Sequence, residues 1–362
     1  MFQLSEHQLK SFYRDGFLVL KGVIPTTTID LARRNFYKML GRLSNQVSPS
    51  FNTSQKSRDQ ELHKLDYKNF LKGEDPLYLD LFNKSDVRKS IESMFGSPVY
   101  PANTVQLAIN FPEDPSNRIN EAGYKDSETP FKGWCGHLDG LWNGGTSPPE
   151  IGKSMTAYQR RKWYSWHPRN GVPKSHPELN CNIFNFSALI GIPLSDQSQI
   201  GVGNVGVLKG AHHKMEVFFK MQWEKGGPLG PGGPGWPREN YQAPNGHGLR
   251  HYPDSVREAF RRGAAKTSDG FFWPRPTMIR AKPGDAIIIH FALPHSATRV
   301  NGPDPRLMIF FRLSPKRRQK KYMHAYPRAL YDIWHEWKGM SNIIEWCRSP
   351  ERPRQTEAAS SR

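Results

Sequence analysis

The sequence has only three cysteines, Cys135, Cys181 and Cys347, in 362 residues. Their separations fit no zinc-site spacing, and an odd number argues against a disulfide framework. A reducing compartment is therefore favoured, and we expect a cytoplasmic location. No run of the chain approaches the roughly 20 apolar residues that span a bilayer. Residues 1–10 also lack the charged and then apolar pattern of a secretory signal peptide, so we expect no membrane span.

Acidic residues are also scarce. The chain has 33 Asp and Glu against 51 Lys and Arg, which gives a formal net charge of +18. Such an excess attracts anions and can steer acidic substrates or nucleic acid. No RNP, zinc-finger or basic-zipper pattern accompanies the charge, so nucleic-acid binding has no motif to support it. The densest run, Lys316 to Lys321, is typical of a solvated turn, with phosphate or nucleic-acid binding as the alternative.

Glycine and proline are abundant, at 31 and 30 residues, and 12% of the chain is aromatic. This composition predicts one compact domain with long loops, over residues 1–348, and a disordered tail at 349–362. Two long insertions, at about 140–180 and 212–275, are rich in tryptophan and basic residues. We expect both insertions to border the substrate opening.

Helices are expected toward the two ends of the chain and strands between them. Apolar residues at helical spacing predict helices over residues 4–15, 27–43, 86–95 and 325–346, the first of them capped by Ser5. Short apolar or alternating runs bounded by Gly, Pro and Asn predict strands over residues 17–20, 104–110, 182–193, 204–208, 286–291 and 306–313. Strands that follow one another without helices favour an antiparallel barrel or sandwich over a parallel sheet.

The segment Gly136-His137-Leu138-Asp139-Gly140 carries two metal-ligand side chains two positions apart. Side chains alternate along an extended segment, so His137 and Asp139 would share one face and could bind one metal ion. A later histidine would complete a facial triad, which leaves three positions open for a co-substrate and oxygen. Taken alone, a His-x-Asp pair is more often a surface or hydrogen-bonding pair.

A second motif supplies that histidine. Residues 282–285 form a Lys-Pro-Gly-Asp turn, an apolar strand follows, and His295 lies beyond its far end. His290 is five positions earlier, which would place it on the opposite face of a continuous strand. We interpret His295 as the ligand and His290 as a core histidine. The remaining histidines of interest are interpreted as loop residues, one of which could reach substrate: His212, His213, His247 and His251.

Arg306 begins the next apolar strand after His295. An arginine among apolar neighbours needs an anionic partner. The planar guanidinium matches a carboxylate with two parallel hydrogen bonds, as at the far end of a dicarboxylic acid.

The order of these motifs resembles the phytanoyl-CoA dioxygenase family of Fe(II)- and 2-oxoglutarate-dependent oxygenases. The similar segments are Gly-His-x-Asp-Gly, then Gly-Asp with an apolar strand and His295, then Asn-Gly-Pro-Asp-Pro-Arg. Residues 12–20 look like the family's N-terminus, and residues 205–212 like its strand ending in Pro-Gly-Ser-His, with Lys209 in place of the proline. The resemblance runs from about residue 4 to 315.

The resemblance implies a mainly β fold with a double-stranded β-helix core, a cupin-like jelly-roll, flanked by N- and C-terminal α-helices. It implies Fe(II) held by His137, Asp139 and His295, and 2-oxoglutarate held by Arg306, with O2 as the other co-substrate. The implied reaction releases succinate and CO2 and hydroxylates or otherwise oxidises a small organic substrate.

Further residues are expected around this centre. Gln106 and Thr298 are assigned to 2-oxoglutarate, and Asn110, Trp134 and Trp142 to the substrate pocket. Gln106 and Asn110 share one face of their expected strand, where ordinary sheet hydrogen bonding is the alternative. Core packing is the alternative for the two tryptophans.

Two other functions are weighed against this one. A non-catalytic member of the fold would bind an acidic ligand or nucleic acid through the basic surface. The intact triad and Arg306 argue against such a loss of catalytic activity. A halogenase generally needs the carboxylate position vacated for chloride, and Asp139 is present. The basic balance favours an anionic small-molecule substrate, whereas the sequence specifies neither its identity nor the oligomeric state.

Overall fold

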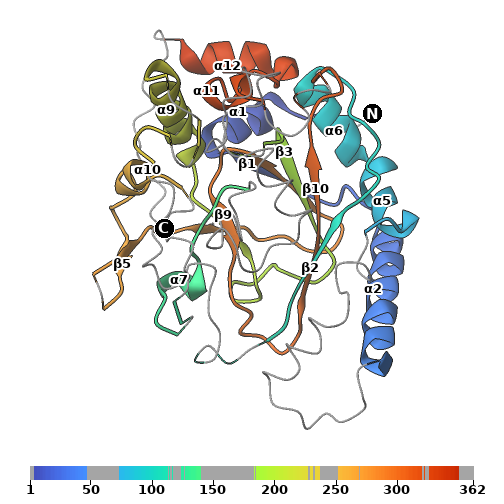
Figure 1. The fold of residues 1–362 in the computed structure, drawn as a ribbon. Helices are drawn as coiled ribbons and strands as arrows, with labels where there is room; N and C mark the ends of the chain where they lie inside the picture. Colours follow the sequence, from blue (N-terminus) through green and yellow to red (C-terminus); the bar gives the residue numbers. More distant parts are fainter. Residues whose placement is uncertain are drawn as a thin grey trace, which may run out of the picture.

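Two antiparallel sheets lie at the centre of the molecule, and helices lie outside them (Figure 1). The structure is a computed structural model, which describes residues 4–46, 73–112, 114, 116, 124–125, 127–139, 183, 185–226, 229–230, 233–236, 252–268, 270–319, 322 and 326–349. Trp142, His247, His251, the insertion at 140–180 and the tail from 350 lie outside the described residues.

The larger sheet has the strand order β1-β8-β3-β10-β2. Its strands are β1 (Phe17–Leu20), β8 (Ala286–His290), β3 (Ala188–Pro193), β10 (Arg306–Leu313) and β2 (Gln106–Asn110). The smaller sheet has the order β7-β4-β9, from β7 (Thr277–Met278), β4 (Val205–Val207) and β9 (His295–Ala297). The backbone of His137 adds an antiparallel bridge to His295 at the β9 edge.

The strand order is that of a double-stranded β-helix. In chain order the core strands are β2, the His137 segment, β3, β4, β7, β8, β9 and β10. The larger sheet holds, side by side, β2, β10, β3 and β8, which are the first, eighth, third and sixth core strands. The smaller sheet holds the His137 segment, β9, β4 and β7, which are the second, seventh, fourth and fifth. The chain thus winds between two facing sheets as in a jelly-roll. This confirms the expected fold, with β1 added at one edge of the larger sheet.

β10 shows how the larger sheet separates an outer from an inner face. Phe311 packs toward the helices, with its ring centroid 5.3 Å from that of Phe82 on α5 (Pro76–Asn83). Side chains alternate along a strand, so Arg306 and Arg312 lie on the opposite, inner face. Gln106, Ala108 and Asn110 are directly opposite Phe310, Met308 and Arg306 in the register, so they share the inner face, as the alternation predicts.

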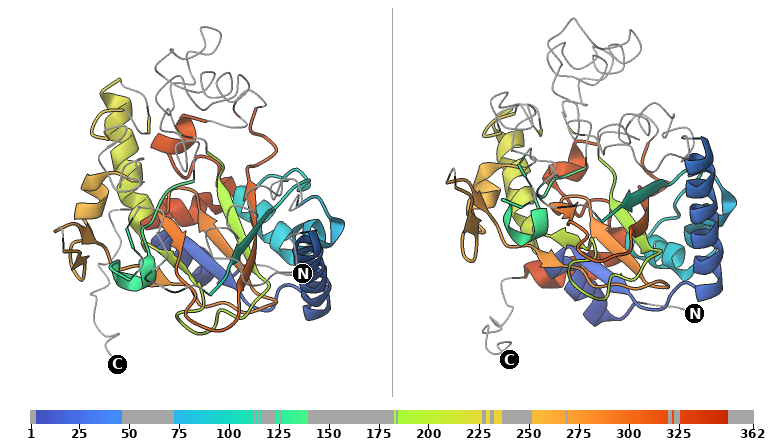
Figure 2. Two further views of the ribbon diagram at one scale, coloured as in Figure 1. Left: turned by 60° about the horizontal axis from the view of Figure 1, so that its bottom comes forward. Right: turned by 90° about the horizontal axis from the view of Figure 1, so that it is seen from below.

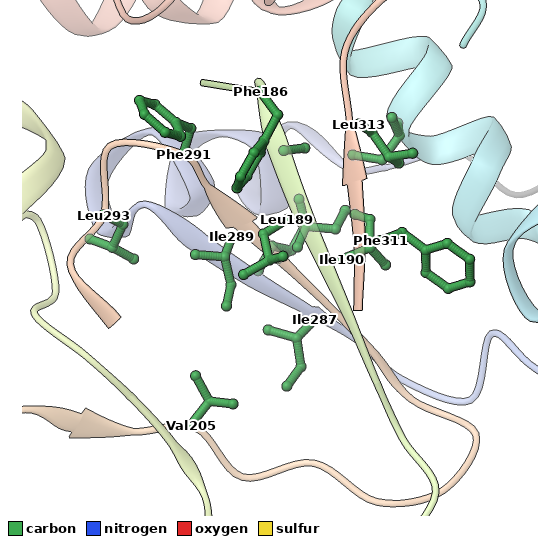
Figure 3. Close-up of a cluster of buried hydrophobic side chains, with 14 of the residues drawn as sticks. Phe186, Leu189, Ile190, Val205, Ile287, Ile289, Phe291, Leu293, Phe311 and Leu313 are labelled. Carbon is green, nitrogen blue, oxygen red and sulfur yellow. The ribbon is translucent and has the colours of Figure 1, made fainter. Parts of the chain in front are cut away.

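An apolar layer fills much of the space between the sheets. Figure 3 shows Leu189, Ile287 and Ile289 of the larger sheet near Val205 of the smaller one, all of them buried. Phe186 and Phe291 meet edge to face with ring centroids 5.3 Å apart. Burial of these side chains supplies most of the free energy that holds the sheets together.

Helices pack on the outside of this core. In both views of Figure 2 the strands lie centrally, with α9 (Ala211–Glu224) on one side and α2 (Thr26–Gln46) on the other. The other helical segments are α1 (Glu6–Asp15), α6 (Asp86–Phe95), α7 (Pro130–Gly133), α10 (Asp254–Glu258), α11 (Arg328–Tyr331), η4 (Lys338–Met340) and α12 (Ser341–Arg348). A small hairpin joins β5 (Ala265–Lys266) and β6 (Phe272–Trp273). Within the described ranges, no helix has the length and apolar character that a membrane crossing requires.

The N-terminal helix follows its sequence signals closely. Ser5 accepts a hydrogen bond from the Gln8 backbone N–H at 3.2 Å, and the Gln8 side chain accepts one from Ser5 N–H at 2.8 Å. This reciprocal capping box begins α1 where predicted. Gly16 ends the helix at φ +80°, where a Cβ would lie 2.6 Å from the His212 ring. The chain can therefore turn into β1 only with glycine at this position.

The prediction of one amphipathic helix over residues 325–346 is wrong. The structure has α11, then turns, then η4 and α12, and the turns use hydrogen bonds between residues three apart. The apolar stripe is nevertheless buried, because Trp334 and Trp337 pack against Phe12 of α1 with ring centroids 5.9 and 4.9 Å away. Tertiary packing thus preserves the burial pattern without a continuous helix.

The interpretation of residues 316–321 as a solvated basic turn is also wrong for one of its arginines, Arg318. Arg318 is buried and forms an ion pair with Glu336 at 2.5 Å. Arg317 donates to the carbonyl oxygen of Phe95 at 2.8 Å. Both contacts hold the segment after β10 against its neighbours, and burial removes Arg318 from any surface that could bind phosphate or nucleic acid.

Candidate metal centre

His137 and His295 lie directly opposite each other on neighbouring extended segments. The N–H of His137 donates to the His295 carbonyl at 3.0 Å, and the N–H of His295 donates to the His137 carbonyl at 2.9 Å. Opposed residues of an antiparallel pair point their side chains to the same face, and the two ring centroids are 5.0 Å apart. The backbone ladder therefore brings together two imidazoles from distant parts of the sequence.

Asp139 completes the cluster. One ligand atom from each of His137, Asp139 and His295 lies within 4.8 Å of the others. The sequence motif predicts this grouping, because the period of two puts His137 and Asp139 on one face. Within the described part of the chain, this is the group of three His, Cys, Asp or Glu side chains that could hold a metal ion.

The segment before His137 is held by a buried tryptophan. Trp134 is fully buried, and its indole N–H donates to the Gly206 carbonyl at 2.9 Å. Gly136 has φ +73°, and a Cβ there would lie 2.6 Å from the Trp134 ring. The N–H of Gly136 donates to Ser296 Oγ at 3.2 Å, which ties the segment to β9. Glycine is therefore needed where the chain passes over the indole to present His137.

The contacts of His295 fix which of its ring nitrogens can bind metal. Nδ1 lies 2.9 Å from the carbonyl oxygen of Leu293. A carbonyl only accepts hydrogen bonds, so Nδ1 carries the proton and Nε2 keeps its lone pair. Burial lowers the pKa of His295 more than the neighbouring Asp139 raises it. The side chain is thus a neutral imidazole with a free Nε2, which is the form that binds a metal ion.

The Asp139 carboxylate is buried yet stays ionised. Burial on its own would raise the pKa of Asp139, but a hydrogen bond from His137 and nearby charges, including Arg312, outweigh it and hold the pKa well below 3.8. Arg312 donates to Asp139 Oδ2 from Nε at 2.8 Å and from Nη2 at 2.7 Å. The other oxygen, Oδ1, lies 3.5 Å from Nε2 of His137.

The three candidate ligands open on a cavity of about 390 Å³ between the sheets. The cavity is lined by Gln106, Leu107, Ala108, Ile109, Asn110, Gly133, Cys135, His137, Asp139, Leu189, Val205, His295, Ser296, Ala297, Arg306, Phe310 and Arg312. Among these residues Asp139 is the only acid, whereas Arg306 and Arg312 are cations. The cavity wall therefore combines a candidate metal-ligand cluster with two groups that attract anions.

Arg306 lies on the cavity wall at the start of β10 and is only 3% exposed. Its Nη1 donates to Asn110 Oδ1 at 3.2 Å, and its Nη2 lies 3.0 Å from Met308 Sδ. Both of these acceptors are neutral. The arginine thus begins β10, as the sequence predicts, and the structure places it on the inner face beside Asn110.

The other predicted site residues divide into two groups. Gln106 and Asn110 line the cavity with Arg306. Thr298 is buried behind the wall, where its hydroxyl donates to the Asn204 carbonyl at 2.9 Å, so its proton is not directed at the cavity. Trp134 likewise lies behind the ligand segment and is not among the lining residues.

Sequence reasoning missed Arg312. A usable signal was present, because Arg312 follows Arg306 by an even number of positions on one predicted strand and must share its face. What the sequence could not supply was the contact with Asp139, which comes from the opposite sheet.

Three other histidines of the described residues, His212, His213 and His290, make structural contacts. His290 is a core histidine, as interpreted, and its Nε2 lies 3.1 Å from the Ile333 carbonyl. The argument from one continuous strand is wrong, however, because β8 ends at His290 in the larger sheet and β9 begins at His295 in the smaller. His212 and His213 are also not loop residues, since they lie in the first turn of α9 with Nε2 atoms 2.8 and 2.9 Å from the Tyr13 carbonyl.

Part of the second insertion packs beside the metal-ligand segment. Cys135 lies in a small cluster with Trp273, against which Tyr124 and Phe271 pack. The guanidinium of Arg257 lies 4.4 Å from the centroid of the Phe271 ring. This hairpin region of the insertion therefore packs against Cys135, a cavity-lining residue two positions before His137.

No protein-family model matches the chain, and no curated protein matches it in sequence. Among solved structures, AviO1 from Streptomyces viridochromogenes Tue57 is similar with a TM-score of 0.42 and 13% identity, over 88% of this chain and 98% of that chain. HygX from Streptomyces hygroscopicus with iron bound has a TM-score of 0.37 and 14% identity, over 87% and 88% of the two chains. The non-heme alpha ketoglutarate dependent carbocyclase SnoK from nogalamycin biosynthesis has a TM-score of 0.39 and 11% identity, over 86% and 84%. Values this low assign neither a function nor a ligand to this chain.

Proposed function

We propose that this chain is a mononuclear non-haem iron oxygenase that uses 2-oxoglutarate to oxidise a small organic substrate. The observation that carries the proposal is the position of His137, Asp139 and His295, which face one cavity together with the buried cation Arg306. The motif order along the sequence supports membership of the phytanoyl-CoA dioxygenase family.

The donor set fits Fe(II). Two imidazoles and one carboxylate form the facial triad typical of non-haem iron oxygenases, which leaves coordination positions open on one side. Two of the donors are in their metal-binding state, since Nε2 of His295 has a free lone pair and the pKa of Asp139 is held low. A three-ligand zinc site uses similar donors, so metal analysis belongs to the test.

Arg306 is suited to hold 2-oxoglutarate. The guanidinium lies on the cavity wall among apolar strand residues, where a dicarboxylate gains two charge-assisted hydrogen bonds from it. Asn110 orients this guanidinium through its Oδ1. Gln106 lies four residues from Asn110 on the same face of β2 and lines the same cavity, which supports its assignment to the co-substrate.

The chemistry divides between the bound groups and the chain. Fe(II), when bound, supplies oxygen activation, coupled to oxidative decarboxylation of 2-oxoglutarate to succinate and CO2 and usually to hydroxylation of the substrate. The chain orients the co-substrate through Arg306 and excludes water with Leu189, Val205 and Phe310, which line the same cavity. A dry site strengthens the electrostatic interactions within it.

The substrate we propose is anionic and small. Two of the described lining residues are cations and one is an acid, and the whole chain carries a formal charge of +18. Such a field raises the local concentration of anions at the cavity. A cytoplasmic site of action agrees with the scarcity of cysteine.

The test is anaerobic titration of the purified, metal-free chain with Fe(II) and 2-oxoglutarate, followed by admission of oxygen and assay of succinate. We expect a visible charge-transfer band on titration and slow succinate formation, both abolished in His137→Ala. His7→Ala is the matched control, since His7 is exposed on α1. A folded wild-type chain that binds metal and forms neither band nor succinate would exclude the proposed reaction and favour a binding protein.

A further inference from the structure

The inner face of β10 carries a second arginine close to the candidate ligands. Arg312 pairs in the sheet register with Leu189 of β3, and both residues line the cavity. Its Nε and Nη2 both donate to the same oxygen of Asp139, Oδ2, at 2.8 and 2.7 Å. The guanidinium therefore binds one of the two carboxylate oxygens through two of its nitrogens.

This interaction gives the two oxygens of Asp139 different surroundings. Oδ2 is engaged by Arg312, whereas Oδ1 lies on the histidine side, 3.5 Å from His137 Nε2. A carboxylate free to rotate can offer one or both oxygens to a metal ion. With Oδ2 engaged, Asp139 has one oxygen to offer, and the second cannot occupy a further coordination position.

The contact also spans the two sheets. Asp139 follows His137, whose backbone is bridged to β9 of the smaller sheet, whereas Arg312 belongs to the larger sheet. The Arg312 side chain is 39% exposed and that of Asp139 is 12% exposed. A pair with one partner so exposed to water contributes little to the stability of the fold. The effect of Arg312 on the orientation of the Asp139 carboxylate is therefore more important than its effect on stability.

We propose that Arg312 is a positioning residue that fixes Asp139 as a single-oxygen ligand and thereby preorganises the metal site. This inference rests on the metal centre proposed above. It predicts that the fork geometry of the guanidinium matters as well as its charge. A cation near a metal ion also repels it, so geometry and charge act in opposite directions on metal affinity.

The test compares Co(II) binding to metal-free wild type, Arg312→Met, Arg312→Lys and His137→Ala, followed by the visible d–d absorption of the bound ion. We expect both Arg312 variants to bind Co(II) roughly 10–100-fold more weakly, as is usual when an outer-shell partner of a ligand is lost. Lysine keeps the charge but not the two-donor fork. We also expect the d–d spectrum of Arg312→Met to change, because a released Asp139 can chelate with both oxygens.

Lys21→Met is the matched control. Lys21 forms an ion pair with Asp285 at 2.9 Å, with an exposed cation and a buried acid, and neither residue lines the cavity. Like Arg312→Met, it removes the cation of a pair that joins distant parts of the chain. We expect it to bind Co(II) as the wild type does, with the same spectrum, whatever its effect on the unfolding temperature.

The outcomes separate the two proposals. Wild-type affinity and spectrum in Arg312→Met would overturn the positioning role while leaving the metal centre intact, provided that His137→Ala has lost binding. Tighter Co(II) binding by Arg312→Met would also overturn it, since Arg312 would then act only by repulsion. If the wild-type chain binds Co(II) no better than His137→Ala, the metal centre itself is wrong and the role of Arg312 falls with it.

Discussion

His137 and His295 exchange both of their backbone hydrogen bonds, at 3.0 and 2.9 Å, although β3, β4, β7 and β8 lie between them in sequence. Two of the candidate ligands are thus set by a backbone ladder between segments and not by flexible loop tips. Removal of either imidazole leaves that ladder in place, because the hydrogen bonds are made by the main chain. The site and the fold are therefore separable by mutation.

Arg306→Met should weaken 2-oxoglutarate binding with little effect on metal binding. Loss of hydrogen bonds to a charged group costs about 1.5–3 kcal/mol, which corresponds to a roughly 10–100-fold rise in the KM for 2-oxoglutarate. Co(II) affinity should remain close to that of the wild type, since Arg306 contacts Asn110 and Met308 and is not one of the candidate ligands. Succinate formation at varied 2-oxoglutarate concentration measures the effect.

Arg33→Met on α2 serves as the control for that substitution, because it removes an exposed arginine whose partner is Asp30. An unchanged KM in Arg306→Met would show that Arg306 does not hold the co-substrate. A large loss of Co(II) affinity in the same variant would instead assign it to the support of the metal site.

Gly136→Ala should damage both the fold and the metal centre. Gly136 has φ +73°, and an added Cβ would lie 2.6 Å from the buried ring of Trp134. Backbone strain in the left-handed region costs roughly 1–2 kcal/mol, and the clash adds to it. Because His137 follows directly, we expect weaker Co(II) binding as well as a lower free energy of unfolding in denaturant.

Gly22→Ala isolates the strain from the clash. Gly22 has φ +61° and nothing within 4 Å of an added Cβ, so the substitution should cost only the backbone strain and leave Co(II) binding unchanged. Equal losses of stability in the two variants would mean that Trp134 yields to the new methyl group and does not constrain the His137 segment.

The grouping of the three candidate ligands could be predicted because its signals are local. His137 and Asp139 share a face by the two-residue period of an extended segment, and His295 stands beyond a turn and an apolar strand. The strand positions followed from similar patterns, and β10 begins and ends where predicted. Alternation also put Gln106 and Asn110 on the inner face, which the register with β10 confirms.

The features that could not be predicted depend on contacts between distant segments. The ion pair of Arg312 with Asp139 joins two sheets, and no local pattern in either segment encodes it. Arg318 is likewise part of a basic run whose burial depends on Glu336, a residue in a region predicted to be a continuous helix. In each case a partner far along the chain decides whether a charged side chain is solvated.

The buried histidines should make the fold sensitive to acid. Burial lowers the pKa of His290 to about 3 and that of His212 well below 6.5. The folded state holds these rings neutral, whereas the unfolded chain takes up protons near pH 6.5. Their contribution to stability is therefore complete above pH 6.5 and is lost as the pH falls toward 3, by about 1.4 kcal/mol per pH unit for each such histidine.

His290→Gln tests this dependence. Gln can still donate to the Ile333 carbonyl, which lies 3.1 Å from His290 Nε2, but it cannot take up a proton. The variant should be less stable than the wild type at pH 7, because the new side chain packs less well among Phe12, Trp334 and Trp337. Its free energy of unfolding should be measured in urea from pH 7 to pH 4 on metal-free protein. We expect it to fall less steeply with decreasing pH than that of the wild type, by about 1.4 kcal/mol per pH unit, which is the contribution of one protonation. The same slope in both proteins would mean that His290 is protonated in the folded state or that other groups control the acid response.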